Sequence, residues 1–233
     1  MAKLFLIPTT LSNTINQCEL LPYQLEQIKY LKYFIVETAK IARMHLKQFN
    51  LNTPLQELEI QELNKHQKDL NSIIKPLLDG HDVGLISDCG MPAIADPGSA
   101  IVRLAHLHNV TVIPFAGPNS LLMALMASGV SGQNFAFTGY LPVNTQERLN
   151  KLKQLQELVL KYHQSQIIIE VPFRNGQLLT ALIDNLAPQI TLSIAINLMQ
   201  ANEQIISKSI KNWRLQAGLP DVHKQEAVFV IGI

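Results

Sequence analysis

Short apolar runs that favour β-structure alternate with helical patterns along almost the whole chain. The clearest run covers residues 83–87 and is continuously apolar, as in strands buried on both faces. In the first half the alternation passes through five strands, which predicts a mostly parallel sheet. The second half has more strands and fewer crossover helices, which predicts a mixed sheet. We therefore expect an α/β fold of two lobes, residues 1–115 and 116–233, with a ligand in the cleft between them.

The periodicity predicts individual elements. Strands are expected over residues 3–7, 33–36, 55–60, 83–87, 110–114, 135–141, 167–170, 191–198, 203–209 and 227–231. Helices are expected over residues 22–31, 38–49, 65–78, 96–108, 119–127, 145–162 and 175–186. Thr145 is the expected N-cap of the long polar helix. The last two strands are expected to form an antiparallel pair.

Composition narrows the class of protein. Apolar residues make up 47% of the chain and charged residues 16%, which indicates a folded core rather than disorder. No apolar stretch reaches the ~18 residues of a membrane span, and the run before Pro8 is too short for a signal peptide, so we expect a cytoplasmic protein. Cys18, Cys89 and seven scattered histidines make no metal pattern, and we expect each histidine at the surface or at a helix end. The net charge of +1 neither supports nor excludes an RNA partner.

Residues 87–99 form the most informative segment, S-D-C-G-M-P-A-I-A-D-P-G-S. It joins the most apolar strand to a helix, and ligands of open α/β sheets bind beyond the carboxyl ends of strands. Gly90 and Gly98 permit close backbone approach, and Asp88 supplies a carboxylate at the strand end. The segment matches neither a Walker loop nor a dinucleotide-binding fingerprint. A purely structural turn, with Asp96 as a cap, is an equally good interpretation.

A second strand-to-helix loop covers residues 114–120, P-F-A-G-P-N-S. Its Gly and Pro set a turn, while Asn119 or Ser120 can cap free N–H groups or bond a ligand. Capping is the commoner role of such residues.

Taken together, these segments resemble a known family. The patterns S-D-x-G-x-P-x-I-x-D-P-G, P-x-x-G-P-x-S and G-Y-L-P at residues 139–142 are similar to those of the ribosomal small-subunit methyltransferase I group of the tetrapyrrole-methylase superfamily. The opening L-I-P-T-T and the segment E-V-P-F-R at residues 170–174 resemble the family more weakly.

The resemblance implies a two-lobed tetrapyrrole-methylase fold that binds S-adenosylmethionine between the lobes. It implies an RNA methyltransferase that acts on a ribose 2′-hydroxyl of small-subunit RNA, needs no metal and forms a homodimer. The cofactor-binding positions that it implies are Pro8, Ser87, Asp88, Met91, Ile94, Asn119, Ser120, Val171, Leu198 and Ala227.

The chain also departs from the family pattern. Where the family has A-E-D-T-R, this chain has V-E-T-A-K at residues 36–40 and keeps only Glu37. The family's H-D-H-N-E is replaced by Q-E-L-N-K at 61–65, and its A-R-E-L-T-K by A-I-N-L-M-Q at 195–200. We therefore expect an acceptor that differs from the usual one or is bound differently, with Lys40 and Lys65 as compensating groups.

No catalytic residue is identified by the sequence. A ribose hydroxyl acceptor needs a proton acceptor, for which Asp88, Glu37 and Glu170 are candidates, although a solvated or capping role is the commoner one for the two glutamates. Two alternatives stay open beside RNA methylation: methylation of a tetrapyrrole or other metabolite, and cofactor binding with little catalysis. A phosphate track or a merely solvated face would account for a set of basic residues, Lys29, Lys32, Lys40, Arg43 and Lys47.

Overall fold

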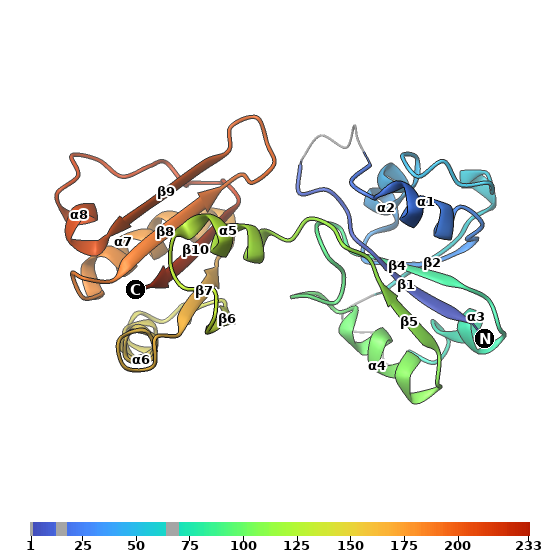
Figure 1. Cartoon of the computed structure of the whole chain (residues 1–233), viewed down its shortest axis with the longest axis horizontal. Coiled ribbons are helices and arrows are strands. Elements are labelled where there is room, and N and C mark those ends of the chain that lie inside the picture. The colour runs from blue at the N-terminus through green and yellow to red at the C-terminus, as the bar shows by residue number, and fades with distance from the viewer. Residues whose placement is uncertain (1, 13–17, 64–69) are drawn as a thin grey trace. The chain divides into compact units, whose positions relative to one another are not determined.

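A computed structural model describes residues 2–12, 18–63 and 70–233 of the chain (Figure 1). The chain divides into two compact units, Met1–Asn119 and Ser120–Ile233. Each unit holds one five-stranded sheet with helices packed against it. The α/β class and the fold predicted from the sequence are confirmed.

The sheet of the first unit is parallel throughout, in the order β3-β2-β4-β1-β5. Its strands are β1 (Lys3–Ile7), β2 (Tyr33–Val36), β3 (Glu59–Glu62), β4 (Val83–Ile86) and β5 (Thr111–Pro114). Its α-helices are α1 (Pro22–Ile28), α2 (Ala39–Leu46), α3 (Lys75–Leu78) and α4 (Ser99–Leu107), with a 3-10 turn η1 at Leu55–Glu57. Because all strands are parallel, their carboxyl ends lie along one edge of the sheet.

The central strand β4 explains why this sheet forms. Every residue of β4 is buried, and apolar clusters cover both faces of the sheet. Gly84 lies so close to the ring of Phe34 that a Cβ atom there would be 2.7 Å from it. A larger residue at Gly84 would therefore displace the side chains of Phe34 and Ile7 on the neighbouring strands β2 and β1.

The sheet of the second unit is mixed, in the order β6-β7-β10-β8-β9. Only β6 and β7 pair in parallel, and the other pairs are antiparallel. The strands are β6 (Phe135–Gly139), β7 (Ser165–Ile169), β8 (Thr191–Ile196), β9 (Gln204–Ser209) and β10 (Ala227–Gly232). The helices are α5 (Ser120–Ser128), α6 (Thr145–Tyr162), α7 (Asn175–Asn185) and α8 (Ile210–Arg214), with a 3-10 turn η2 at Pro172–Arg174.

Helices cover both faces of this second sheet. One face, which includes Ile194 and Phe229, forms a single core with α6, α7 and α8. Ser193 and its partner Ser207 point to the other face, because side chains alternate along a strand. There the Ser207 hydroxyl donates to the carbonyl of Ser128 (2.6 Å), which places the end of α5 on that face.

Several local predictions are wrong. The strand expected over 55–60 begins only at Glu59, because Leu55 and Leu58 are spaced three apart and suit the 3-10 turn that precedes β3. Of the helix expected over 65–78, only Lys75–Leu78 is α-helical, and residues 64–69 lie outside the described part. The last two strands do not pair with each other, since both pair with β8. The short helix α8 was not predicted.

Candidate active site

Loops from neighbouring strands meet at the carboxyl edge of the first sheet. The amide of Thr9, after β1, donates to the carbonyl of Gly90, after β4 (2.9 Å). Ser87 is buried, and its hydroxyl donates within the same loop to that carbonyl (3.3 Å). These bonds join two of the segments in which the sequence places cofactor contacts, those at Pro8 and at residues 87–91.

The loop between β4 and α4 is held in an unusual conformation. Ala93 and Ala95 have φ of 67° and 64°, a region that residues other than glycine seldom adopt. The Asp96 carboxylate accepts hydrogen bonds from the amides of Ala93 (2.9 Å) and Gly98 (2.6 Å) and thereby fixes the loop. Burial raises the pKa of Asp96, while the two backbone bonds lower it. Asp96 is thus structural, and Ile94 is left exposed between the two strained residues.

A polar cluster surrounds Asp88 at the ends of β2 and β4. The hydroxyl of Thr38 donates to the Asp88 carboxylate (2.7 Å). The backbone amide of Asp88 donates to the Glu37 carboxylate (3.4 Å). His45 Nε2 donates to the Asp88 carbonyl (3.3 Å). The cluster therefore fixes both the side chain and the backbone of a predicted cofactor contact.

His45 lies in the last turn of α2, which agrees with the expected helix-end position, but its side chain is buried rather than at the surface. Only 3% of His45 is exposed, and burial lowers its pKa, which favours the neutral imidazole. The sequence contained a sign of this, since His45 lies three residues after Ala42 on the buried side of α2.

The loop after β5 packs against the end of β1. A Cβ atom on Gly117 would lie 2.3 Å from Cγ of Pro8, so only glycine allows this approach. Asn119 is buried, and its amide lies 3.7 Å from the sulfur of Met91. The first unit therefore brings together five predicted contacts: Pro8, Ser87, Asp88, Met91 and Asn119. Ser120 begins α5 in the second unit.

The remaining predicted contacts share one edge of the second sheet. Ala227 pairs with Ile196 and Val228 with Ile169, so the start of β10 lies beside the ends of β7 and β8. Val171 and Leu198 follow those two strand ends. Leu198 and Ala227 are buried, and Val171 is half-buried. The fold thus gathers three positions that are distant in the sequence.

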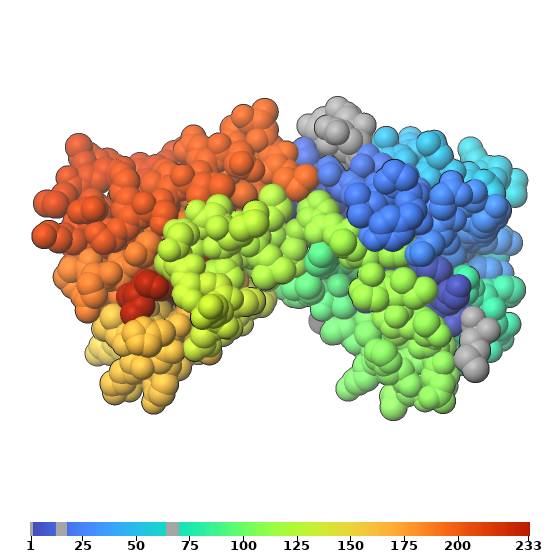
Figure 2. All heavy atoms as spheres, viewed as in Figure 1, coloured from blue at the N-terminus to red at the C-terminus, as the bar shows by residue number. Residues whose placement is uncertain are grey.

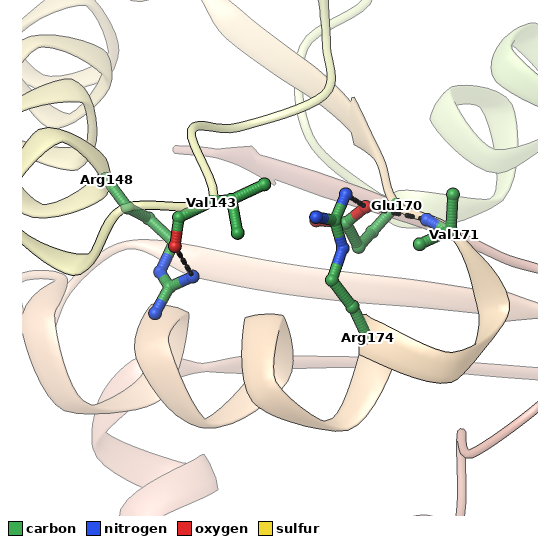
Figure 3. Close-up of polar contacts among 5 residues, drawn as sticks. All are labelled: Val143, Arg148, Glu170, Val171 and Arg174. Carbon is green, nitrogen blue, oxygen red and sulfur yellow. Dashed lines mark hydrogen bonds and ion pairs between the residues drawn. The ribbon is translucent and has the colours of Figure 1, made fainter.

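Glu170 is neither solvated nor a simple cap. Its side chain is 6% exposed and accepts bonds from the Arg174 guanidinium (2.6 Å) and from the amide of Val171 (2.7 Å), as Figure 3 shows. The guanidinium of Arg174 also lies 5.9 Å from the ring of Phe173. The pair explains why a glutamate and an arginine four residues apart occur together in the segment 170–174.

Amide groups hold the loop after β8. The side chain of Asn197 accepts from the amide of Glu226 (3.1 Å) and donates to the side chain of Gln225. The Asn175 side chain donates to the Gln225 carbonyl (2.6 Å). Asn197 itself has a φ of 49°. Neutral amide groups therefore hold Asn197, while the amide of Met199 donates to the Glu203 carboxylate (2.7 Å), in the segment where the family pattern carries ions.

The suggested track of basic residues is partly neutralised. Lys29 pairs with Glu26, and Lys32 pairs with Glu59. Lys40, Arg43 and Lys47 remain exposed on or just after α2, whereas Lys65 lies outside the described residues. A continuous phosphate track through all five residues is therefore not supported.

Within residues 2–12, 18–63 and 70–233, no three His, Cys, Asp or Glu side chains are placed to hold a metal ion. No helix in the described part of the chain has the length and apolar character needed to span a membrane.

Comparison with known proteins identifies relatives along most of the chain, although no family model matches it. A ribosomal RNA small subunit methyltransferase I from Hydrogenobaculum sp. is 30% identical over 216 residues, which cover 90% of this chain and 86% of the relative. Its namesake in Synechocystis sp. is 28% identical over 88% of this chain and 70% of the relative. The namesake from Mesorhizobium japonicum is 32% identical over 69% of this chain, and that alignment spans about half (53%) of the relative.

A solved structure has the same fold. The crystal structure of the methyltransferase CobJ superposes with a TM-score of 0.62 over 99% of this chain and 93% of CobJ, at 13% sequence identity. At that identity the likeness concerns the fold alone. The relatives and the fold agree with the resemblance seen in the sequence, and the chain belongs to the ribosomal RNA small subunit methyltransferase I family of methyltransferases.

Proposed function

We propose that this protein transfers the methyl group of S-adenosylmethionine to RNA of the small ribosomal subunit, at a ribose 2′-hydroxyl. The observation that carries the proposal is the relationship to a methyltransferase with that RNA in its name, across 90% of this chain. The 2′-hydroxyl is the acceptor that the sequence resemblance implies.

Two sets of residues would bind the methyl donor, one in each unit. In the first unit these are the loops at Pro8, at residues 87–94 and at Asn119. In the second unit they are Ser120, Val171, Leu198 and Ala227. Methyl transfer from a sulfonium ion is an in-line displacement, so the protein contributes mainly orientation and exclusion of water. A loop fixed by Asp96 and a carbonyl fixed by His45 suit that task, because neither needs to reorganise during the reaction.

The acceptor hydroxyl must also lose a proton. Of the three candidate carboxylates, Glu170 is occupied by Arg174, which makes it a poor base. Asp88 and Glu37 are next to each other at the proposed cofactor loop. We therefore propose one of these two carboxylates as the proton acceptor.

The direct test is a methyl-transfer assay with labelled S-adenosylmethionine. The protein is incubated with deproteinised small-subunit RNA, with intact small subunits and with a metabolite extract. We expect label in RNA and, after nuclease digestion and mass spectrometry, a 2′-O-methylated nucleoside. Label in neither RNA sample, with the cofactor bound, would contradict the proposal.

Methylation of a small molecule remains the second candidate. The amide network around Asn197 replaces groups that are charged in the family pattern, and each lost ionic bond changes what the site can hold. This candidate predicts label in the metabolite extract alone. A bacterium that lacks its own small-subunit methyltransferase I provides a second test, because only an RNA-modifying enzyme would restore the missing methylation.

We also propose that the protein forms a homodimer through the outer side of α5. Between its terminal serines α5 contains only apolar residues, and such a helix is normally covered on all sides. Leu122 and Met126, one turn apart, are nevertheless 47% and 80% exposed. Phe135 and Phe137 of the edge strand β6 are also exposed, and α5 and β6 reach the surface in the space-filling view (Figure 2, yellow-green). Exposed apolar side chains of this kind fit an interface with a second copy of the chain, because a two-fold dimer uses the same surface of both copies.

A further inference from the structure

Two exposed aromatic side chains follow neighbouring strands of the second unit. Tyr140, just after β6, is 59% exposed, and Phe173, just after β7, is 63% exposed. Since β6 and β7 are adjacent and parallel, both residues lie at the same edge of the sheet. Neither ring belongs to the hydrophobic core of this unit. Their exposure therefore calls for an explanation other than packing of the fold.

An arginine lies close to the same edge. Arg148, in the first turns of α6, bonds the carbonyl of Val143 (3.3 Å), as Figure 3 shows. It lines an open groove together with Gly176 and Gln177 of α7, and Asp184 lies at the same groove without forming an ion pair with it. Among the described residues Arg148 has no ion-pair partner, whereas Arg174 is neutralised by Glu170. Arg148 is thus available to bind an anion.

We propose that this strip, defined by Tyr140, Val143, Arg148, Phe173 and Gln177, binds the single-stranded RNA segment that carries the methyl acceptor. Bases stack on exposed aromatic rings, and a guanidinium pairs with a backbone phosphate. The strip continues directly into Val171, one of the proposed cofactor contacts. The inference rests on the proposed function and names the part of the surface that recognises the substrate.

The chemistry of the strip favours single-stranded over duplex RNA. Duplex RNA is bound mainly through several phosphate and 2′-hydroxyl contacts, and its bases are not free to stack on the protein. Among the described residues the strip offers one cation without an ion-pair partner and two exposed aromatic rings. Binding should therefore depend on stacking more than on charge. The affinity should fall with salt concentration only as steeply as about one phosphate contact predicts.

Fluorescence anisotropy with a labelled single-stranded oligoribonucleotide of mixed sequence, and with the matching duplex, tests the strip. The variants are Tyr140→Leu, Phe173→Leu and Arg148→Gln. Matched controls are Tyr162→Leu, an exposed tyrosine at the far end of α6, and Lys153→Gln, an exposed cation on the same helix. Circular dichroism and S-adenosylmethionine affinity are measured for every variant.

We expect each aromatic substitution to weaken single-strand binding about tenfold, Arg148→Gln to weaken it and reduce its salt dependence, and both controls to leave it unchanged. Unchanged RNA affinity in all three strip variants would overturn the inference, as would duplex bound as tightly as single strand. Methylation of intact small subunits is assayed with the same variants, and a loss seen only there would point to a ribosomal protein as the partner and would equally overturn the inference. Failure of the proposed function looks different, because the wild-type protein would then bind S-adenosylmethionine yet neither bind nor methylate RNA.

Discussion

At the end of β1 the ring of Pro8 fills the space that a side chain on Gly117 would need. A Cβ atom on Gly117 would lie 2.3 Å from Cγ of Pro8. Across the same edge, one imidazole fixes the Asp88 carbonyl and one carboxylate fixes the amides of Ala93 and Gly98. Neither His45 nor Asp96 needs to touch a ligand. Each decides where the neighbouring backbone lies, and the proposed cofactor contacts depend on that placement.

Ser120→Trp is expected to abolish binding of S-adenosylmethionine without unfolding the protein. Ser120 is half-buried at the start of α5, and an indole ring there would occupy the volume proposed for the cofactor. Isothermal calorimetry measures binding, and circular dichroism checks the fold. Thr145→Trp, at the first residue of α6, is the control and should bind normally. Unchanged affinity in the Ser120 variant would exclude this position from the cofactor site.

The buried His45 predicts a dependence of stability on pH. Burial lowers its pKa below 6.5, so the unfolded chain binds the proton more tightly than the folded one. Its contribution to the free energy of unfolding is therefore full above pH 6.5 and is lost as the pH falls below that value.

His45→Gln removes this titration and keeps an N–H donor for the Asp88 carbonyl. Urea unfolding at pH 8 and pH 5.5 should show a larger loss at low pH for the wild type than for the variant. The two proteins share every other titrating group, including Asp96, whose raised pKa acts in the opposite sense. Equal losses would mean that His45 is not held neutral.

At the level of elements, the structure decides which residue caps the N-terminus of α6. The sequence favours Thr145 as the N-cap, but the side chain of Asn144 accepts from the amides of Gln146 (2.9 Å) and Glu147 (3.2 Å). Asn144 precedes the helix with an extended backbone, and Thr145 is already helical. Both residue types are good caps, so only the backbone conformation decides between them.

Asn144→Ala should therefore lower the free energy of unfolding of the second unit by about 1 kcal/mol. The effect should reach the whole unit, because Leu152, Leu155 and Val159 of α6 are part of its core. Thr145→Ala should change it by less than about 0.5 kcal/mol. Chemical denaturation followed by circular dichroism measures both. A larger loss for Thr145→Ala would reverse the assignment of the cap.

At the scale of the whole molecule, Met126→Lys tests the proposed homodimer. In a monomer this residue is 80% exposed, so a lysine there would be harmless. In a dimer built on α5 it would place a charge in an apolar interface, which is costly. Sedimentation velocity should show a dimer for the wild type and a monomer for the variant. Leu215→Lys, at another highly exposed apolar residue of the second unit, should remain dimeric; a dimer in both variants would place the interface elsewhere.

The sequence by itself determined the class of fold, most of the strands and the two loops at residues 87–99 and 114–120. Apolar runs, periodicity and glycine–proline turns are local properties, and they need no knowledge of distant residues. Only the tertiary structure decided that β10 lies between β7 and β8, which brings Val171, Leu198 and Ala227 to one edge. It also decided that His45 is buried against Asp88 and that Glu170 is paired with Arg174. Strand order and the contact of His45 with the Asp88 carbonyl arise between segments far apart in the chain. The Glu170–Arg174 pair spans only four residues, but the fold decides that its carboxylate is buried.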